Sequence, residues 1–116
     1  MARILIIDPS SEISELLAHA VSRLGHEPLV TTAVSAGDEV AADVALVEPA
    51  FHDTFAAATQ LRESQPELPI VCLSIYPKSL AVAALAPIAY LLKPFTLTEL
   101  EQTLRLALES TLAQAV

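Results

Sequence analysis

Four polar side chains stand at positions from which they could act together on a charged group. Asp8, Glu48, Ser74 and Lys93 each follow directly on an apolar run of four or five residues. Two carboxylates, a hydroxyl and an ammonium are groups that can bind a metal ion, a phosphoryl group or one another. Polar residues also commonly end buried strands, so the pattern has a purely structural interpretation as well. The choice between the two depends on whether the four runs lie side by side.

Short apolar runs alternate with helical patterns along the whole chain. The runs predict buried strands at 4–7, 28–31, 44–47, 70–73 and 88–92. Helices are predicted from a cap at Ser10 or Ser11 up to Gly25, and at 35–42, 53–64, 79–85 and 97–114. Successive strand–helix units favour an α/β fold, a doubly wound parallel sheet with helices on both faces. Because the carboxyl ends of parallel strands meet at one edge, the four polar residues are expected to share that edge.

Helical periodicity predicts which helix faces are buried. In the first helix the predicted inward face is Ile13, Leu16, Leu17, Ala20 and Leu24. In the last helix it is Leu97, Leu100, Leu104, Ala107 and Leu108. Leu106 falls on the polar side of that helix, so we expect it to be exposed. Asp53, at the start of the helix at 53–64, is expected to be its N-cap.

The composition limits the chain to a few classes of protein. Its 116 residues form one predicted domain over 1–116, and 53% hydrophobic residues are enough for a core. Six basic against 14 acidic residues give a formal net charge of −8, which argues against direct binding of nucleic acid. Cys72 is the only cysteine, so an intramolecular disulfide is excluded. No apolar stretch approaches the roughly 20 residues of a membrane span, and without a targeting segment we expect a cytoplasmic protein.

Four segments in a fixed order resemble bacterial response-regulator receiver domains, and the resemblance covers nearly the whole chain. The segments are Ile4–Asp8, Asp43–Glu48, Leu68–Ser74 and Tyr90–Phe95. The resemblance implies a flavodoxin-like (βα)5 fold with a five-stranded parallel sheet in the order 2-1-3-4-5. It also implies a two-component phosphorelay, in which a histidine kinase supplies a phosphoryl group to an Asp at the end of the third strand. In that family, two acids after the first strand help to hold Mg²⁺.

Carried over position by position, the resemblance assigns a role to each polar residue at the sheet edge. Glu48 stands at the phospho-accepting position and Asp8 stands in the acidic pocket. Lys93 stands where the family has a Lys that contacts the phosphoryl group. Ser74 and Tyr90 stand at the positions of the switch hydroxyl and the switch aromatic. The resemblance further predicts a cis peptide bond between Lys93 and the proline after it.

The sequence departs from the family's pattern at the residues that would do the chemistry. The phospho-accepting position holds Glu48 in place of Asp, and Pro9 replaces the second acid of the metal site. Because Mg²⁺ demands near-octahedral oxygen ligands, we expect its binding to be weak or absent, and no other metal site or cofactor is predicted. The longer side chain alters the reach of the nucleophile, but it lets Glu48 approach Lys93 and stand in for part of a phosphorylated Asp. Ile75, where the family has a small residue, would crowd a switching movement of Tyr90.

These departures favour a pseudo-receiver, a non-catalytic signalling module that keeps the fold and acts through protein–protein contacts. Its partners would be signalling proteins, such as a histidine kinase or an effector. The contact face we expect combines the helix at 79–85, the strand at 88–92 and the helix at 97–114. Leu106 is its predicted interface residue, and the same face could form a homodimer.

Two other functions stay open on the sequence. One is a working phospho-receiver that uses Glu48 or Asp53. The other is a small cofactor-binding protein on the same fold, which is weakened because the Asp8–Ser11 turn lacks the glycines of a phosphate-binding loop.

Overall fold

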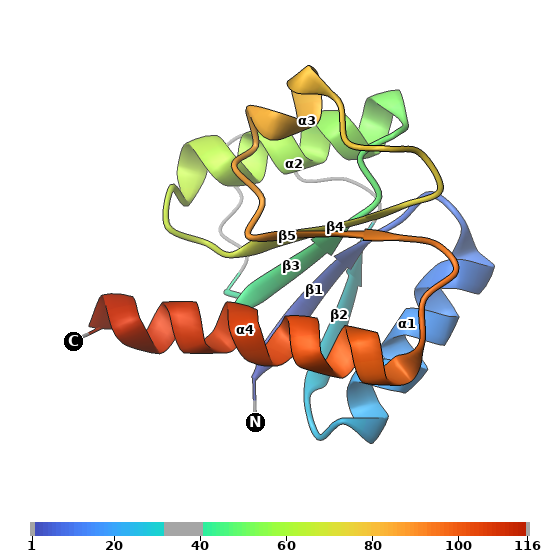
Figure 1. The fold of residues 1–116 in the computed structure, drawn as a ribbon, viewed down its shortest axis with the longest axis vertical. Helices are drawn as coiled ribbons and strands as arrows, with labels where there is room; N and C mark the ends of the chain where they lie inside the picture. The colour runs from blue at the N-terminus through green and yellow to red at the C-terminus, as the bar shows by residue number, and fades with distance from the viewer. Residues whose placement is uncertain (1, 32–40, 116) are drawn as a thin grey trace.

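The structure is a computed structural model that describes residues 2–31 and 41–115, with side chains up to residue 110. Its strands are β1 (Arg3–Ile7), β2 (Glu27–Thr31), β3 (Val44–Val47), β4 (Ile70–Ser74) and β5 (Ala89–Leu92). The helices of the described part are α1 (Ser11–Arg23), α2 (His52–Ser64), α3 (Leu80–Ala83) and α4 (Leu97–Ala115), as Figure 1 shows. Each strand therefore lies within one residue of a predicted apolar run. The predicted helix at 35–42 lies outside the described residues, except for its last two positions.

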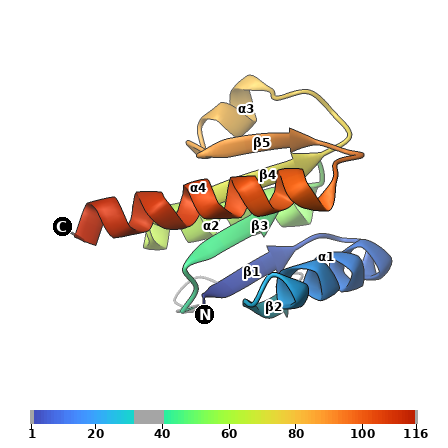
Figure 2. The same cartoon turned by 60° about the horizontal axis from the view of Figure 1, so that its bottom comes forward.

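The strands form one parallel sheet in the order β2-β1-β3-β4-β5, which confirms the predicted topology. Helices α1 and α4 cover one face of the sheet, and α2 and α3 cover the other (Figures 1 and 2). Strands β1, β3, β4 and β5 are consecutive neighbours in this order. Their carboxyl ends therefore meet along one edge, which is where the polar residues that follow them must lie.

Both faces of the sheet are buried, which explains the unbroken apolar runs of the central strands. Alternate residues of each strand point to opposite faces and so enter two separate cores. The core under α1 and α4 contains Ile4, Ile6, Leu17, Val21, Val44, Leu46, Val71, Leu73, Leu100, Leu104 and Ala107. The core under α2 and α3 contains Leu5, Ile7, Ala45, Val47, Ala57, Ala58, Leu61, Leu68, Ile70, Cys72, Val82 and Leu85. Packing on both sides holds the sheet edge in a fixed shape.

Helix α1 begins at a predicted cap, because the Ser10 hydroxyl oxygen accepts a hydrogen bond from the Ile13 N–H (3.3 Å). It ends just before Gly25, whose φ of 89° is the left-handed conformation that glycine adopts readily. The predicted inward face is wrong at Leu16, which is 66% exposed, whereas Leu17 is buried. Successive helical residues are about 100° apart, so seating Leu17 against the sheet turns Leu16 to the side of the helix.

Helix α2 begins at His52, one residue earlier than predicted, and Phe51 occupies the N-cap position without a side-chain hydrogen bond. The expectation that Asp53 is the N-cap is therefore wrong, since Asp53 lies exposed in the first turn. The buried Thr54 hydroxyl donates instead to the carbonyls of Glu48 and Phe51. These bonds tie the start of α2 to the end of β3 and so hold the backbone at Glu48.

Helix α4 begins with a capping box. The Thr96 N–H donates to the Glu99 carboxylate (3.2 Å), and the Glu99 N–H donates to the Thr96 hydroxyl oxygen (3.0 Å). The predicted inward residues that are fully buried are Leu100, Leu104 and Ala107. Leu97 is a correction, because it is 43% exposed and lines a groove between α1 and α4 instead of the sheet. Leu106 is exposed, as its place on the helix predicts.

Candidate functional site

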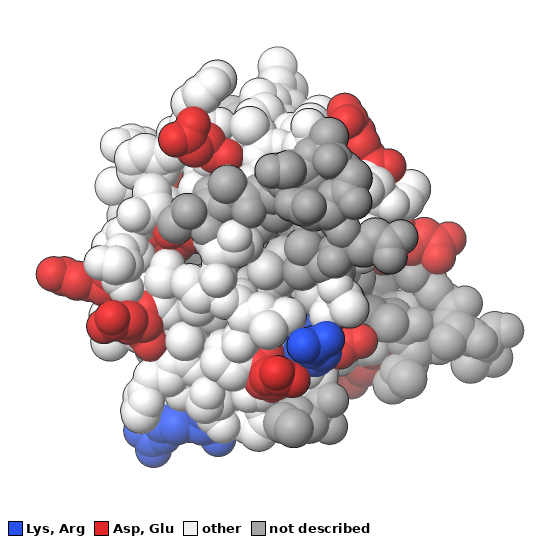
Figure 3. Space-filling model, turned by 180° about the vertical axis from the view of Figure 1, so that it is seen from behind, with Lys and Arg blue, Asp and Glu red and all other residues white. Residues whose placement is uncertain are grey.

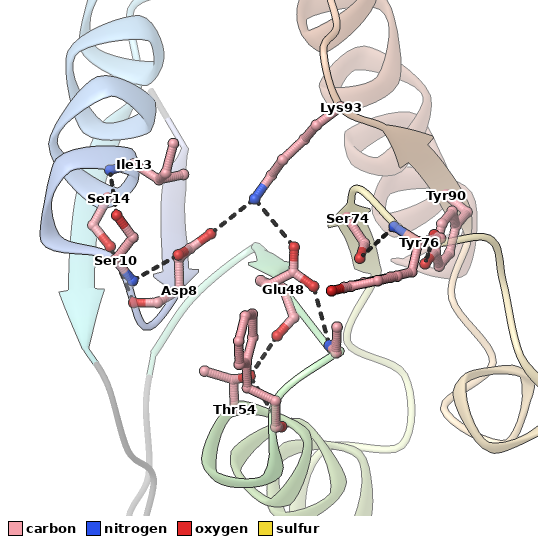
Figure 4. A network of polar contacts seen from close by, with 12 residues as sticks. Asp8, Ser10, Ile13, Ser14, Glu48, Thr54, Ser74, Tyr76, Tyr90 and Lys93 are labelled. Carbon is pink, nitrogen blue, oxygen red and sulfur yellow. Dashed lines mark hydrogen bonds and ion pairs between the residues drawn. The ribbon is translucent and has the colours of Figure 1, made fainter.

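The Lys93 ammonium joins the two acidic residues of the sheet edge. Its Nζ lies 3.1 Å from Asp8 Oδ2 and 3.1 Å from Glu48 Oε2. Asp8 follows β1, Glu48 follows β3 and Lys93 follows β5, so the contact spans the carboxyl edge of the sheet. Figure 4 shows the Lys93 side chain reaching to a point between the two carboxylates. The predicted convergence of these three residues is confirmed by the two ion pairs.

Both carboxylates are buried, and each is also held by a backbone N–H. Asp8 is 3% exposed and Glu48 is 4% exposed. Asp8 Oδ1 accepts from the Ser10 N–H at 2.8 Å, and Glu48 Oε1 accepts from the Ala50 N–H at 3.0 Å. In both cases the donor stands two residues further along the chain, with a proline between. These two bonds were not predicted from the sequence, although an acid followed by Pro is a turn signal.

Lys93 is aimed at the acids by the turn that follows β5. Its backbone N–H donates to the Ser74 carbonyl (2.8 Å), which continues the pairing of β5 with β4 beyond the last paired residues. The peptide bond between Lys93 and Pro94 is cis, as predicted. The Lys93 side chain is 17% exposed and lines the groove between α1 and α4, as do Pro94 and Phe95. The end of the strand and this turn therefore direct the ammonium back over the sheet edge.

Ser74 lies at the same edge but binds a different part of the chain. Its buried hydroxyl oxygen accepts a hydrogen bond from the Tyr76 N–H (3.2 Å). The Tyr90 hydroxyl donates to the Tyr76 carbonyl (2.6 Å). The two bonds hold the start of the loop between β4 and α3, as Figure 4 shows. Sequence reasoning did not single out Tyr76, because both bonds use its backbone and no side-chain pattern reveals them.

Ile75 and Tyr90 line different cavities. Tyr90 lies at a pocket of about 360 Å³ on the α2 and α3 side, together with Phe51, Phe55 and Tyr76. Ile75 is 64% exposed and lines the groove of about 580 Å³ between α1 and α4, on the other side of the sheet. The two side chains therefore face different cavities in this structure, and the crowding of a switching movement of Tyr90 by Ile75 stays a prediction.

The groove between α1 and α4, here called the α1–α4 groove, exposes apolar side chains beside the ion pairs. Leu16, Ile75 and Leu97 line it and are exposed to solvent. Exposed apolar residues that gather in one place are more typical of interaction sites than residues scattered singly. This groove was not predicted from the sequence, because helical periodicity assigns Leu16 and Leu97 to buried faces.

The donor set at the edge does not fit the Mg²⁺ that the family resemblance implies. The first strand supplies Asp8 but Pro9 offers no carboxylate. Each carboxylate oxygen of Asp8 and Glu48 already accepts a hydrogen bond from a backbone N–H or from Lys93. The ammonium also occupies the position between the carboxylates that a bridging cation would need. Mg²⁺ gives up its water reluctantly and would gain few free oxygen ligands from these residues.

The ion-pair cluster combines two negative charges and one positive charge in a largely buried environment. At about 4 Å and an effective dielectric constant near 20, each pair attracts by a few kcal/mol, from which desolvation must be subtracted. Removing Lys93 would leave two buried carboxylates without a counter-charge. The lysine is therefore the group that makes burial of Asp8 and Glu48 tolerable.

The surface charge is mainly acidic. On the face shown in Figure 3, acidic side chains are spread widely and the few basic ones lie apart from one another. Among the described basic residues, Arg3 and Arg105 pair with acidic neighbours, at 3.4 Å and 3.0 Å. Such a surface is unlike the basic stripe that follows a nucleic-acid backbone. Of the described helices, none combines the length and the apolar character that a membrane span requires.

Comparisons with known proteins identify the fold. No family model and no curated protein matches the sequence. Among solved structures, NtrX from Brucella abortus is similar with a TM-score of 0.85 and 23% identity, over 98% of this chain and 29% of NtrX. A CheY-like receiver domain protein from Methanospirillum hungatei has a TM-score of 0.83 and 17% identity, over 98% of both chains. A response regulator receiver domain protein from Clostridium thermocellum has a TM-score of 0.78 and 20% identity, over 98% of this chain and 99% of that one. This chain therefore spans less than a third of NtrX but nearly all of the two smaller proteins, and its fold is that of response-regulator receiver domains.

Proposed function

We propose that the chain is a receiver-like module of two-component signalling that acts in the cytoplasm without accepting a phosphoryl group. The observation that carries this proposal is the double ion pair of Lys93 with Asp8 and Glu48. The ammonium already has carboxylate oxygens in the place where a phosphorylated side chain would supply them. Glu48 thus stands in for part of a phosphorylated Asp, and the module keeps one signalling state.

Three features oppose phosphoryl transfer to Glu48. Its two carboxylate oxygens are already bonded to the Ala50 N–H and to Lys93. Its side chain is one methylene longer than that of Asp, and small misplacements of a nucleophile are costly. With Pro9 in place of an acid, the metal ion that would offset the charge of an incoming phosphoryl group lacks a ligand. The negative charges of Asp8 and Glu48 would then repel that group.

A module without phosphorylation must pass information through contacts with proteins. The face predicted for this purpose, formed by α3, β5 and α4, carries the exposed residues Leu80, Leu92 and Leu106. The α1–α4 groove is a second apolar surface beside the ion pairs. We propose a histidine kinase or an effector as the partner, with a homodimer through α3, β5 and α4 as the alternative. A net charge of −8 favours a partner with a basic surface over a second copy.

Treatment with acetyl phosphate and Mg²⁺, followed at once by intact mass measurement, tests the proposal. The expected result is no mass gain, while a receiver domain with an intact phospho-accepting Asp gains one phosphoryl group in parallel. A gain that disappears in Glu48→Ala or in Asp53→Ala would overturn the proposal and identify the alternative phospho-receiver site. A bound small molecule in the purified protein would instead favour the cofactor-binding alternative.

A further inference from the structure

Residues 75–88, here called the strap, connect β4 to β5 and are only lightly packed. They carry a helix of four residues, α3, whereas the other described helices have 13 or 19 residues. Val82 and Leu85 are the strap's only buried residues, and Leu80 is 93% exposed. Two buried apolar side chains hold a segment of this length weakly. Hydrogen bonds must therefore contribute much of what fixes the position of the strap.

A single side chain of α2 fastens the end of the strap. Arg62 Nε donates to the Leu85 carbonyl (2.7 Å), and Arg62 Nη2 donates to the Ala86 carbonyl (3.3 Å). Arg62 Nη1 donates to three carbonyls of the loop between α2 and β4, those of Gln65 (3.5 Å), Pro66 (2.8 Å) and Leu68 (2.8 Å). The rigid fork of a guanidinium is suited to such a task, because its donors point to several acceptors at once. Arg62 thus joins the chain before β4 to the chain before β5.

The backbone at Ala86 shows why this end of the strap needs a fastening. Ala86 has a φ of 50°, a left-handed conformation that residues with a Cβ rarely adopt. A residue in such a conformation persists only where its surroundings hold it. The hydrogen bond from Arg62 to the Ala86 carbonyl is one of the contacts that stabilise this conformation. Desolvation lowers the pKa of Arg62 from its ordinary value, which agrees with a partly buried guanidinium.

Two other hydrogen bonds fix the beginning of the strap. The Tyr90 hydroxyl donates to the Tyr76 carbonyl (2.6 Å), and the Tyr76 N–H donates to the Ser74 hydroxyl oxygen (3.2 Å). The strap is therefore tied to α2 at one end and to the side chains of β4 and β5 at the other. Few buried side chains lie between the two ties.

We propose that the strap moves as one unit between these two ties, and that Arg62 is the positioning residue that sets where it lies. The inference rests on the proposed function, because α3 supplies part of the face that would meet a partner. Release of the strap at Arg62 would change how α3 is presented on that face. The change would also reach the bond between Tyr90 and Tyr76 at the far end.

Hydrogen exchange measured by mass spectrometry on Arg62→Met tests the role of Arg62. Amides of residues 79–88 are expected to exchange about tenfold faster than in the wild type, because the carbonyl ties are lost, while amides of β1 and β3 stay unchanged. In Arg62→Lys the exchange rate of these amides should lie between the rates of the wild type and of Arg62→Met, since an ammonium cannot reach the carbonyls of both loops. Arg105→Met is the matched control, because Arg105 makes an exposed pair with Glu101 on α4. Unchanged exchange in Arg62→Met, or a rise spread evenly over β1 and β3, would overturn the assignment.

Tyrosine fluorescence tests whether the strap moves as one unit. The chain has two tyrosines, Tyr76 and Tyr90, and no tryptophan, and only the Tyr90 side chain takes part in the bond at the start of the strap. A Tyr76→Phe background keeps the backbone groups of residue 76 and leaves Tyr90 as the only fluorophore. Quenching of Tyr90 by acrylamide is expected to rise when Arg62→Met is added to this background, because loss of the bond to the Tyr76 carbonyl gives the quencher more access to the ring. Faster exchange near Leu85 with unchanged quenching would mean that one end frays alone, and the one-unit proposal would be wrong. Neither readout involves phosphate or a partner, so failure here is distinct from failure of the proposed function.

Discussion

Lys93 and Glu48 form an ion pair across an intervening strand. Lys93 follows β5 and Glu48 follows β3, and β4 lies between these strands in the sheet. The Lys93 side chain nevertheless brings its Nζ to 3.1 Å from Glu48 Oε2, and to the same distance from Asp8 beyond it. One side chain thus ties the carboxyl ends of three strands that are not all neighbours. Loss of the two ion pairs should therefore destabilise the whole carboxyl edge of the sheet.

Lys93→Met should lower the free energy of unfolding by about 3 kcal/mol, because two buried carboxylates lose their counter-charge. Urea unfolding followed by circular dichroism measures the loss. Arg105→Met, which removes an exposed pair with Glu101, should change the free energy by about 0.5 kcal/mol or less. Adding Asp8→Asn and Glu48→Gln to Lys93→Met should restore part of the loss. Equal effects of Lys93→Met and Arg105→Met would contradict this view of the site.

Glu48→Asp alone should not turn the chain into a phospho-acceptor. The substitution corrects the length of the side chain, but Pro9 still leaves the metal site one carboxylate short. Intact mass after acetyl phosphate and Mg²⁺ checks this. The matched comparison is Pro9→Asp combined with Glu48→Asp, which supplies both carboxylates. Phosphoryl transfer to Glu48→Asp alone would show that the side-chain length, and not the missing acid, is what prevents the chemistry.

Leu106→Glu should weaken self-association or partner binding while changing stability by no more than about 0.5 kcal/mol. Leu106 is 51% exposed on α4, so a charge there meets solvent in the free protein and an apolar surface in a complex. Sedimentation equilibrium measures self-association, and urea unfolding measures stability. Unchanged association at unchanged stability would remove the support for the face formed by α3, β5 and α4.

Leu16→Glu should leave stability within about 0.5 kcal/mol of the wild type, because Leu16 lies in the α1–α4 groove and not in the core. Leu17→Ala, one residue further on, should cost about 2–5 kcal/mol, because Leu17 is buried against the sheet. The pair therefore tests the rotation of α1 by urea unfolding. A large loss of stability in Leu16→Glu would mean that Leu16 is buried, as helical periodicity alone predicts.

Cys72 should resist alkylation by iodoacetamide in the folded protein and react once the chain is unfolded in urea. Burial raises the pKa of the Cys72 thiol to about 12, with the nearby Glu48 charge acting in the same direction. An unfolded chain loses this proton near pH 9, so the thiol's contribution to stability is present below that pH. The contribution is lost as the pH rises from about 9 towards 12. In Cys72→Ser the free energy of unfolding should fall less over this pH range. Rapid alkylation of Cys72 in the native protein would contradict its burial.

Most of the sheet was predictable from the sequence because its central strands are buried on both faces. A strand such as 44–47 is then a short unbroken apolar run, and the polar residue that follows it marks the sheet edge. The first turn of α2 was less predictable. Asp53 has the residue type of an N-cap, but the bonds of Thr54 to Glu48 and Phe51 decide where the helix begins. A capping preference of about 1 kcal/mol is small enough for such contacts to override.

The residues that can meet at the sheet edge are predictable from the chain alone, since parallel strands in the expected order bring Asp8, Glu48 and Lys93 there whatever the details of packing. The rotation of each helix about its axis depends instead on the packing of the folded chain, and so does the choice of backbone carbonyls that accept from side-chain donors. Leu16 became exposed because Leu17 fits the sheet better, and this choice depends on the shape of the opposing core. Arg62 gained its role because five carbonyls from two loops converge on it. Carbonyls are the same in every residue, so no sequence pattern identifies those that lie together until the chain has folded.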